Sequence, residues 1–255
     1  MIDVNVHLHH WPFRRLNGED PPALVRSLRE RSVTQAWVGS FDGIFHHDLS
    51  AANARLAADC KDHGAEFLIP FGSVNPALPG WQEDLRQCDE AHRMPGIRLH
   101  PNYHGYSLAA PALAELLAAA ARRRMLVQIV TAIEDERTQH PLMRVPPVDL
   151  APLPHVLKQV AGLRVVVLNA GRTPLAKQLS ASGNVCLDIA MVEGVAGVAK
   201  LAADVTPRKL LFGSHAPFFY FEAAALKMKE AGLSENDARA ISETNARNLL
   251  EGRRS

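Results

Sequence analysis

The chain has 255 residues, 47% of them hydrophobic, which is enough for one large α/β domain or two small ones. Its 28 lysine and arginine residues almost balance 27 aspartate and glutamate residues, and the net charge of +1 argues against nucleic acid or an anionic membrane surface as a partner. The three cysteines form no paired motif and are typical of reduced thiols in a cytoplasmic protein. We find no signal-peptide pattern and no apolar run approaching the ~20 residues of a membrane span.

The chain opens on a short apolar strand, residues 2–7, with polar residues at alternate positions. Side chains on a strand alternate between its faces, so Asp3, Asn5 and His7 are expected on one face, and Ile2, Val4 and Val6 on the other. One interpretation is an inner barrel strand that carries Asn5 and His7 into a site. The other, equally open at this point, is a strand end whose polar groups bond to loop backbone.

Strand patterns then alternate with helical patterns along the whole chain. The predicted strands are residues 2–7, 35–40, 67–74, 96–100, 126–131, 164–169, 185–190 and 209–214. The predicted helices are residues 21–31, 51–63, 81–93, 109–124, 150–160, 175–182, 195–203, 222–231 and 234–250. This alternation predicts an α/β protein with a closed (β/α)8 TIM barrel, a single domain over residues 1–255, whose first and eighth strands are neighbours. An open doubly wound sheet is the alternative, but no glycine-rich phosphate loop follows the first strand.

In such barrels the site lies at the carboxyl ends of the strands. The polar side chains at those ends are Asn5, His7, Ser40, Asp42, Asn75, Arg98, His100, Thr131, Asn169, Glu193 and His215. Several titratable groups therefore converge on one mouth. We expect one cavity to be lined by Asn5, His7, Arg98, Asn169 and His215.

Five motifs occur in a characteristic order. They are Ile-Asp-x-x-x-His at 2–7, Gly-Ile-Arg-Leu-His-Pro at 96–101, Val-Val-Leu-x-Ala-Gly at 166–171, Leu-Phe-Gly-Ser-x-Ala-Pro-Phe at 211–218 and Asn-Ala-Arg-Asn-Leu-Leu at 245–250. Together they resemble the amidohydrolase superfamily, in the branch that contains aminocarboxymuconate semialdehyde decarboxylase and related lactonases and hydrolases. The resemblance implies an amidohydrolase-like barrel with hydrolase or carboxy-lyase activity.

The resemblance also implies a divalent metal held by a His-x-His pair on strand one, histidines on strands five and six, and an aspartate on strand eight. This chain has Asn5 and His7, then Val130, Asn169 and His215 at those positions. Valine cannot ligate a metal, and a neutral amide is a poor zinc ligand. We therefore expect no cofactor and no tightly bound zinc of the superfamily's usual kind.

Three hypotheses remain open. In the first, a metal-independent hydrolase uses His215 or His7 as general base, and Arg98 or Arg14 binds a substrate carboxylate. In the second, His7 and His215 form a rebuilt site for zinc or another divalent metal, in a hydrolase or a carboxy-lyase. In the third, the barrel has lost catalysis and serves only for binding.

Two loops at the mouth add candidates. The charged run 134–140 follows the fifth strand, where Asp135 is a candidate catalytic residue and Arg137 a candidate substrate contact, with a solvated loop as the alternative. His100 and His104 flank a turn, and are either substrate contacts or structural histidines. Basic and aromatic residues near the strand ends indicate a small, carboxylated substrate that is cyclic or a lactone. The sequence leaves a homo-oligomer open.

Overall fold

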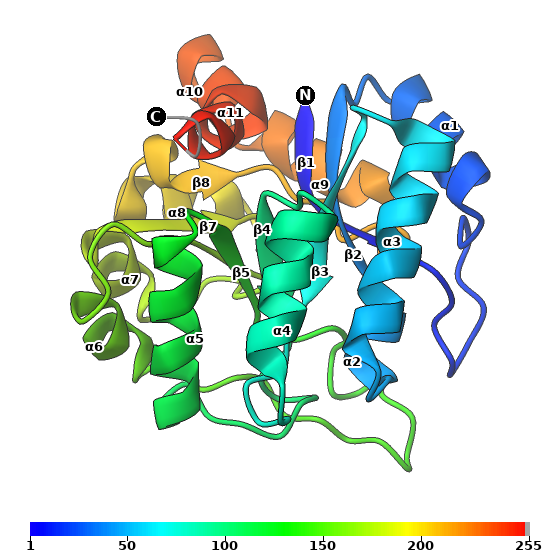
Figure 1. The fold of residues 1–255 in the computed structure, drawn as a ribbon. Helices are drawn as coiled ribbons and strands as arrows, with labels where there is room; N and C mark the ends of the chain where they lie inside the picture. The colour runs from blue at the N-terminus through cyan, green and yellow to red at the C-terminus, as the bar shows by residue number, and fades with distance from the viewer. Residues whose placement is uncertain (253–255) are drawn as a thin grey trace.

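A computed structural model describes residues 1–252 and shows eight parallel strands arranged as a barrel (Figure 1). The strands follow one another around the barrel in chain order, which confirms the predicted (β/α)8 TIM barrel. Their bounds are β1 Ile2–Leu8, β2 Gln35–Ser40, β3 Leu68–Ser73, β4 Gly96–Leu99, β5 Leu126–Val130, β6 Arg164–Leu168, β7 Asn184–Asp188 and β8 Leu210–Leu211. The apolar run Val165–Leu168 of β6 is buried on both faces, as expected for a parallel strand covered by helices.

Helices connect the strands and cover the outside of the barrel. Their bounds are α1 Pro21–Glu30, α2 Asp42–Phe45, α3 Leu49–Gly64, α4 Trp81–Arg86, α5 Pro111–Arg122, α6 Leu153–Lys158, α7 Ala176–Ala181, α8 Gly197–Val205, α9 Phe221–Glu230, α10 Glu235–Arg239 and α11 Asn245–Glu251. No helix within residues 1–252 is both long enough and apolar enough to cross a membrane.

Capping side chains determine where α1 and α3 begin. Before α1, the Asp20 carboxylate accepts a hydrogen bond from the Ala23 amide at 3.1 Å, which satisfies one of the free amides of the first turn. Asp48 caps α3 in the same way, through the Ala51 amide at 2.9 Å. Three features differ from the sequence prediction. The short helix α2 forms inside the predicted loop 41–48, and π-helical turns, Gln87–Ala91 and Ala240–Thr244, interrupt the predicted helices 81–93 and 234–250.

The barrel closes between β1 and the segment that follows β8. The amides of Val4 and His7 donate to the carbonyls of Phe212 and Ala216, at 3.0 and 2.8 Å. Phe212 belongs to the predicted last strand, 209–214, so the first and last predicted strands are neighbours as expected, although β8 itself ends at Leu211. The last strand is nevertheless much shorter than the predicted 209–214, because the chain turns away after it and His215 adopts a left-handed backbone with φ of 60°.

Strand β1 changes face part-way along its length. Its pairing with β2 shifts register between Asp3 and Val6, which marks a bulge. As a result Ile2 and Val4 belong to the apolar cluster inside the barrel, whereas Val6 and Leu8 pack with the surrounding helices. The predicted regular alternation of residues 2–7 is wrong for this reason.

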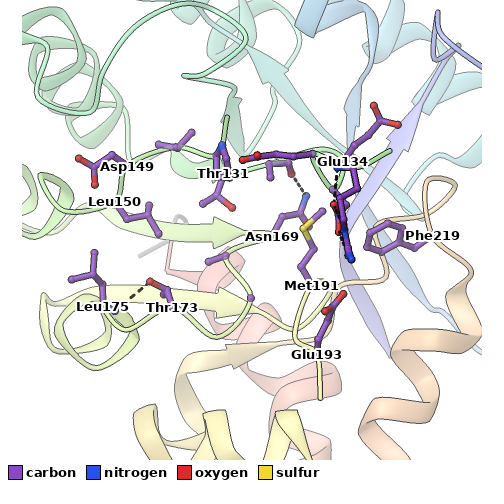
Figure 2. Close-up of a pocket in the computed structure, with 18 residues that line it drawn as sticks. Thr131, Glu134, Asp149, Leu150, Asn169, Thr173, Leu175, Met191, Glu193 and Phe219 are labelled. Carbon is purple, nitrogen blue, oxygen red and sulfur yellow. Dashed lines mark hydrogen bonds and ion pairs between the residues drawn. The ribbon is translucent and has the colours of Figure 1, made fainter. Parts of the chain in front are cut away.

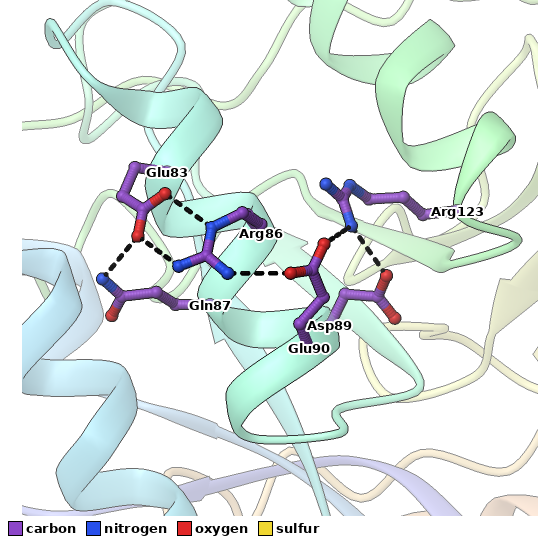
Figure 3. Close-up of polar contacts among 6 residues, drawn as sticks. All are labelled: Glu83, Arg86, Gln87, Asp89, Glu90 and Arg123. Atoms are coloured by element: carbon purple, nitrogen blue, oxygen red, sulfur yellow. Dashed lines mark hydrogen bonds and ion pairs between the residues drawn. The ribbon is translucent and has the colours of Figure 1, made fainter.

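A network of ion pairs joins α4 and the π-helical turn that follows it, Gln87–Ala91, to the end of α5 (Figure 3). Arg86 pairs with Glu83 and Glu90, each at 2.7 Å, and Arg123 pairs with Asp89 at 2.9 Å and Glu90 at 2.8 Å. Single exposed pairs contribute little to stability, but a shared carboxylate such as Glu90 fixes the relative position of the two elements that it joins.

Candidate active site

A cavity of about 740 Å³ opens at the carboxyl ends of β5, β6 and β7, and we call it the mouth pocket. Its wall is formed by Thr131, Ala132, Glu134, Asp135, Glu136, Arg137, Pro147, Val148, Asp149, Leu150, Asn169, Ala170, Gly171, Thr173, Leu175, Met191, Glu193 and Phe219. In Figure 2, Asn169 lies near the middle of these residues, with Asp149 and Leu150 on one side and Glu134 and Phe219 on the other. The position agrees with the mouth predicted for a TIM barrel.

A chain of hydrogen bonds connects the pocket wall with the barrel interior. Asn5 Nδ2 donates to Asn169 Oδ1 and to Asp188 Oδ2, both at 2.7 Å. Asp188 also accepts the Asn169 backbone amide at 2.8 Å. Asn169 Nδ2 donates to the Ala132 carbonyl at 2.7 Å and lies 3.5 Å from His215 Nδ1. Residues from β1 and from the ends of β6, β7 and β8 thus form one polar chain that reaches the pocket through Asn169.

Two members of this chain have strained backbones. Asn169 and His215 both have positive φ, 62° and 60°, at the points where the chain leaves β6 and β8. Such conformations cost on the order of 1–3 kcal/mol in residues other than glycine, and they are concentrated at functional sites. Here they turn the two side chains toward each other.

His215 is a buried, neutral imidazole. Its Nε2 lies 2.8 Å from the Ile133 carbonyl, and since a carbonyl can only accept, Nε2 carries the proton and Nδ1 has the lone pair. Burial lowers the pKa of His215 to about 4, so the ring is uncharged near neutral pH. The lone pair of Nδ1 faces Asn169, directly behind the pocket wall.

Asp188 was missing from the residues predicted from the sequence. It lies at the end of β7, is fully buried and, through burial, has its pKa raised to about 6. Its signal in the sequence is a carboxylate inside the apolar run Val-Cys-Leu-Asp-Ile-Ala, because a charge in a strand buried on both faces needs a partner. Asp3 is similar: burial raises its pKa to about 6, while its Oδ1 accepts the amides of Asn5 and Ser214.

Four of the five residues expected to line one cavity point into the barrel but do not reach the mouth pocket. Asn5, His7, Arg98 and His215 are all completely buried, and only Asn169 is part of the wall. The prediction of a shared cavity is therefore wrong for these four, which pack together beneath the pocket.

Three other predicted substrate contacts also lie off the wall. His100 is buried with neither ring nitrogen hydrogen-bonded, and burial holds its pKa well below the usual range. His104 Nε2 lies 3.0 Å from the Gly43 carbonyl. Arg14 pairs with Glu134 at 2.5 Å and stacks 4.7 Å over the Phe218 ring. None of the three side chains lines the mouth pocket, so their contact with substrate stays a prediction.

Asp135 and Arg137 do lie on the wall, as predicted, but they pair with each other. Arg137 Nη2 lies 2.5 Å from Asp135 Oδ2, and this hydrogen bond lowers the pKa of Asp135 to about 2. A carboxylate with so low a pKa is a weak general base at neutral pH. The structure therefore argues against Asp135 as the catalytic base.

Carboxylates outnumber cations on the pocket wall. Besides Asp135, which pairs with Arg137, and Glu134, which pairs with Arg14, the wall carries Glu136, Asp149 and Glu193. A fixed negative field of this kind repels an anionic ligand. The wall thus favours a neutral substrate over the carboxylated one expected from the sequence.

The residues at the superfamily's metal positions do not fit a divalent ion. The Arg98 guanidinium lies 3.3 Å from His7 Nε2, so a positive charge already faces that nitrogen. The Nε2 proton of His215 is held by Ile133, and Val130 offers no donor atom. Within residues 1–252, no group of three or more histidine, cysteine, aspartate or glutamate side chains is arranged to hold a metal.

The family model of amidohydrolases matches residues 2–252 of this chain. The chain belongs to the amidohydrolase family. This amidohydrolase has no match among curated proteins. Because the family consists of enzymes, membership favours catalysis over the hypothesis of a barrel used only for binding.

Solved structures share the fold of this amidohydrolase at low sequence identity. A dihydroxybenzoic acid decarboxylase from Polaromonas, with bound manganese, is 12% identical, with a TM-score of 0.72 over 100% of this chain and 97% of that one. The 2,6-dihydroxybenzoate decarboxylase from Rhizobium is 11% identical, with a TM-score of 0.73 over 98% of each chain. A candidate 2-pyrone-4,6-dicarboxylic acid hydrolase from Pseudomonas putida is 16% identical, with a TM-score of 0.68 over 98% of this chain and 97% of that one.

Proposed function

We propose that this amidohydrolase hydrolyses a small neutral ester or lactone at the mouth pocket, without a metal ion. The observation that carries the proposal is the hydrogen-bonded chain from Asp188 through Asn5 and Asn169 to His215, which reaches the pocket wall at Asn169. Hydrolysis of an ester needs a group that takes a proton from water and a group that orients the carbonyl.

His215 is the candidate general base. Its Nδ1 has a free lone pair at neutral pH, and the 3.5 Å contact with Asn169 is the longest in the chain, so a water molecule can replace it at little cost. Burial is the main cause of the pKa of about 4, so the entry of water raises the pKa of His215 toward its ordinary value, where the ring is an effective base at neutral pH. Asn169 is the candidate orienting residue, because its amide is held on both sides by Asn5 and Ala132. Phe219 lies against His215, at 5.1 Å between ring centroids, and must move for water to reach the imidazole.

Decarboxylation is the second candidate function. It is favoured by the neighbouring structures, two of which are decarboxylases of hydroxybenzoates. It requires an anionic substrate, and the carboxylates on the pocket wall oppose one. We therefore rank it below hydrolysis of a neutral substrate.

The test is a panel of three substrate classes with purified protein: neutral lactones and esters, the same lactones carrying a carboxylate, and hydroxybenzoates assayed for carbon dioxide release. We expect turnover of the neutral class only. His215→Ala and Asn169→Ala should each lower kcat/KM at least ~100-fold, as expected for loss of a general base or an orienting group. His155→Ala, an exposed histidine on α6, is the matched control and should have no effect.

Dialysis against a chelator distinguishes metal-independent hydrolysis from the metal-dependent alternative. Wild-type activity should survive chelation, and added zinc or manganese should not increase it. Turnover of hydroxybenzoates that depends on added manganese would replace this proposal with the second candidate. Absence of turnover in all three classes would also overturn it.

A further inference from the structure

Arg98 is a buried cation whose donors are all occupied inside the barrel. It lies on β4 and has no exposed surface. Its Nε donates to Gln128 Oε1 at 2.7 Å, and Nη1 donates to the Val6 carbonyl at 2.7 Å. Nη2 donates to the carbonyls of Trp37 at 3.0 Å and Val4 at 3.3 Å. Carbonyl oxygens of β1 and β2 thus surround a guanidinium at the centre of the barrel.

Strand β2 makes room for this side chain through a glycine. A Cβ added at Gly39 would lie 2.8 Å from Arg98 Cδ and 2.9 Å from Nη1. Since Arg98 is held by its hydrogen bonds, a larger residue at this position would have to break some of them to displace it. The cation is therefore an integral part of the barrel's packing.

The contact between Arg98 and His7 determines where the His7 proton resides. Nη1 lies 3.3 Å from His7 Nε2, and a guanidinium can only donate hydrogen bonds. Nε2 is therefore the acceptor, and the proton of the neutral ring lies on Nδ1. His7 Nδ1 is buried and has no hydrogen-bond partner among the described residues, although a buried donor normally has one.

A second unpaired donor lies nearby. Trp11 Nε1 is also buried and without a partner in residues 1–252. Both rings pack on Phe41, His7 stacked at 4.8 Å and Trp11 edge-on at 5.3 Å. Two N–H groups in contact with the same aromatic residue, near the carboxyl end of β1, are thus free to donate to an oxygen acceptor.

We propose that Arg98 takes the place of a metal ion in the barrel interior, beneath the mouth pocket, and that it fixes His7 as a neutral imidazole whose Nδ1–H donates to the carbonyl oxygen of a substrate that reaches past the pocket wall. The donor part of this inference rests on the proposed function, whereas the tautomer does not. Arg98 is then a positioning residue acting through His7. A fixed donor of this kind stabilises the negative charge that develops on a carbonyl oxygen during ester hydrolysis.

The test is nitrogen NMR of protein labelled at its histidines, with the His7 signals assigned from His7→Ala. In the wild type we expect a protonated Nδ1 and an unprotonated Nε2 on His7. Arg98→Met should move part of the His7 population to the Nε2–H form, and Arg98→Lys less so. Arg86→Met, in the surface network of Figure 3, is the matched control and should leave the signals unchanged.

A proton on His7 Nε2 in the wild type would overturn the inference, and this measurement needs no variant to fold. Unchanged His7 signals in a folded Arg98→Met protein would overturn it as well. The probe for the donor is δ-valerolactam, a neutral cyclic amide, which should shift the Nδ1–H signal and bind about tenfold more weakly to His7→Ala. No shift at saturation would mean that an ordered water is the partner, and would refute the donor role even if lactones are hydrolysed.

Discussion

Substituting Gly39 by alanine tests whether Arg98 is immobile in the barrel. The added Cβ would lie 2.8 Å from Arg98 Cδ and 2.9 Å from Nη1, closer than Cβ atoms approach other atoms in real structures. Overpacking alone costs ~1–3 kcal/mol, and a displaced Arg98 would also weaken charged hydrogen bonds worth ~1.5–3 kcal/mol each. We therefore expect Gly39→Ala to lower the free energy of unfolding by about 3–5 kcal/mol.

The assay is urea unfolding followed by circular dichroism. Gly80→Ala is the control: Gly80 has φ of 81° with no atom within 4 Å of an added Cβ, so only backbone strain of ~1–2 kcal/mol applies. In an Arg98→Ala background, Gly39→Ala should cost at least ~1 kcal/mol less than in the wild type. A Gly39→Ala protein that is no less stable than Gly80→Ala would refute the reasoning.

Three further predictions concern buried groups. Burial raises the pKa of Asp3 from 3.8 to about 6, so the unfolded chain loses this proton first and stability falls by up to ~3 kcal/mol as the pH rises from about 4 to 6. In Asp3→Asn this part of the fall should be absent when the free energy of unfolding is measured against pH. The same slope against pH in the variant and the wild type would contradict the prediction. Burial raises the pKa of the Cys60 and Cys88 thiols to about 12 and that of Cys186 to about 11, so the native protein should resist thiol reagents at pH 8 and react at three sites once unfolded. Asn53 bonds to both backbone groups of Ser73, at 2.9 and 2.7 Å, so Asn53→Ala should cost ~2–4 kcal/mol in urea unfolding, well above the half-exposed control Asn102→Ala.

The order of strands and the mouth of the barrel could be predicted from the sequence, because both follow from periodicity and from the parallel direction of the strands. Asn169 lies on the wall of the mouth pocket, as predicted, for this reason. How deep a side chain lies below the pocket could not be predicted in the same way. Arg98 and His7 sit at strand ends in the sequence, but a bulge in β1 and the space left by Gly39 decide that they lie beneath the pocket instead of on its wall.

The pairing of side chains within a loop could not be predicted from the sequence either. Asp135 and Arg137 are two residues apart, a spacing that does not determine whether each faces the pocket or the other. The role expected of Asp135 depended on its pKa, and the contact with Arg137 lowers that pKa to about 2. Asp188 was overlooked because it interrupts a run that otherwise indicates only a buried strand.

The short closing strand has a consequence for amide hydrogen exchange. Strand β1 pairs with β2 at residues along its whole length, whereas on its other side it meets the end of β8 through the amides of Val4 and His7. Local opening begins where few hydrogen bonds must break, so the β8–β1 seam should exchange its amides sooner than the seams between β4, β5 and β6. His7 and His215 lie on either side of this seam, with their rings 5.3 Å apart. Transient separation there, with the rest of the barrel still closed, would expose both imidazoles to solvent.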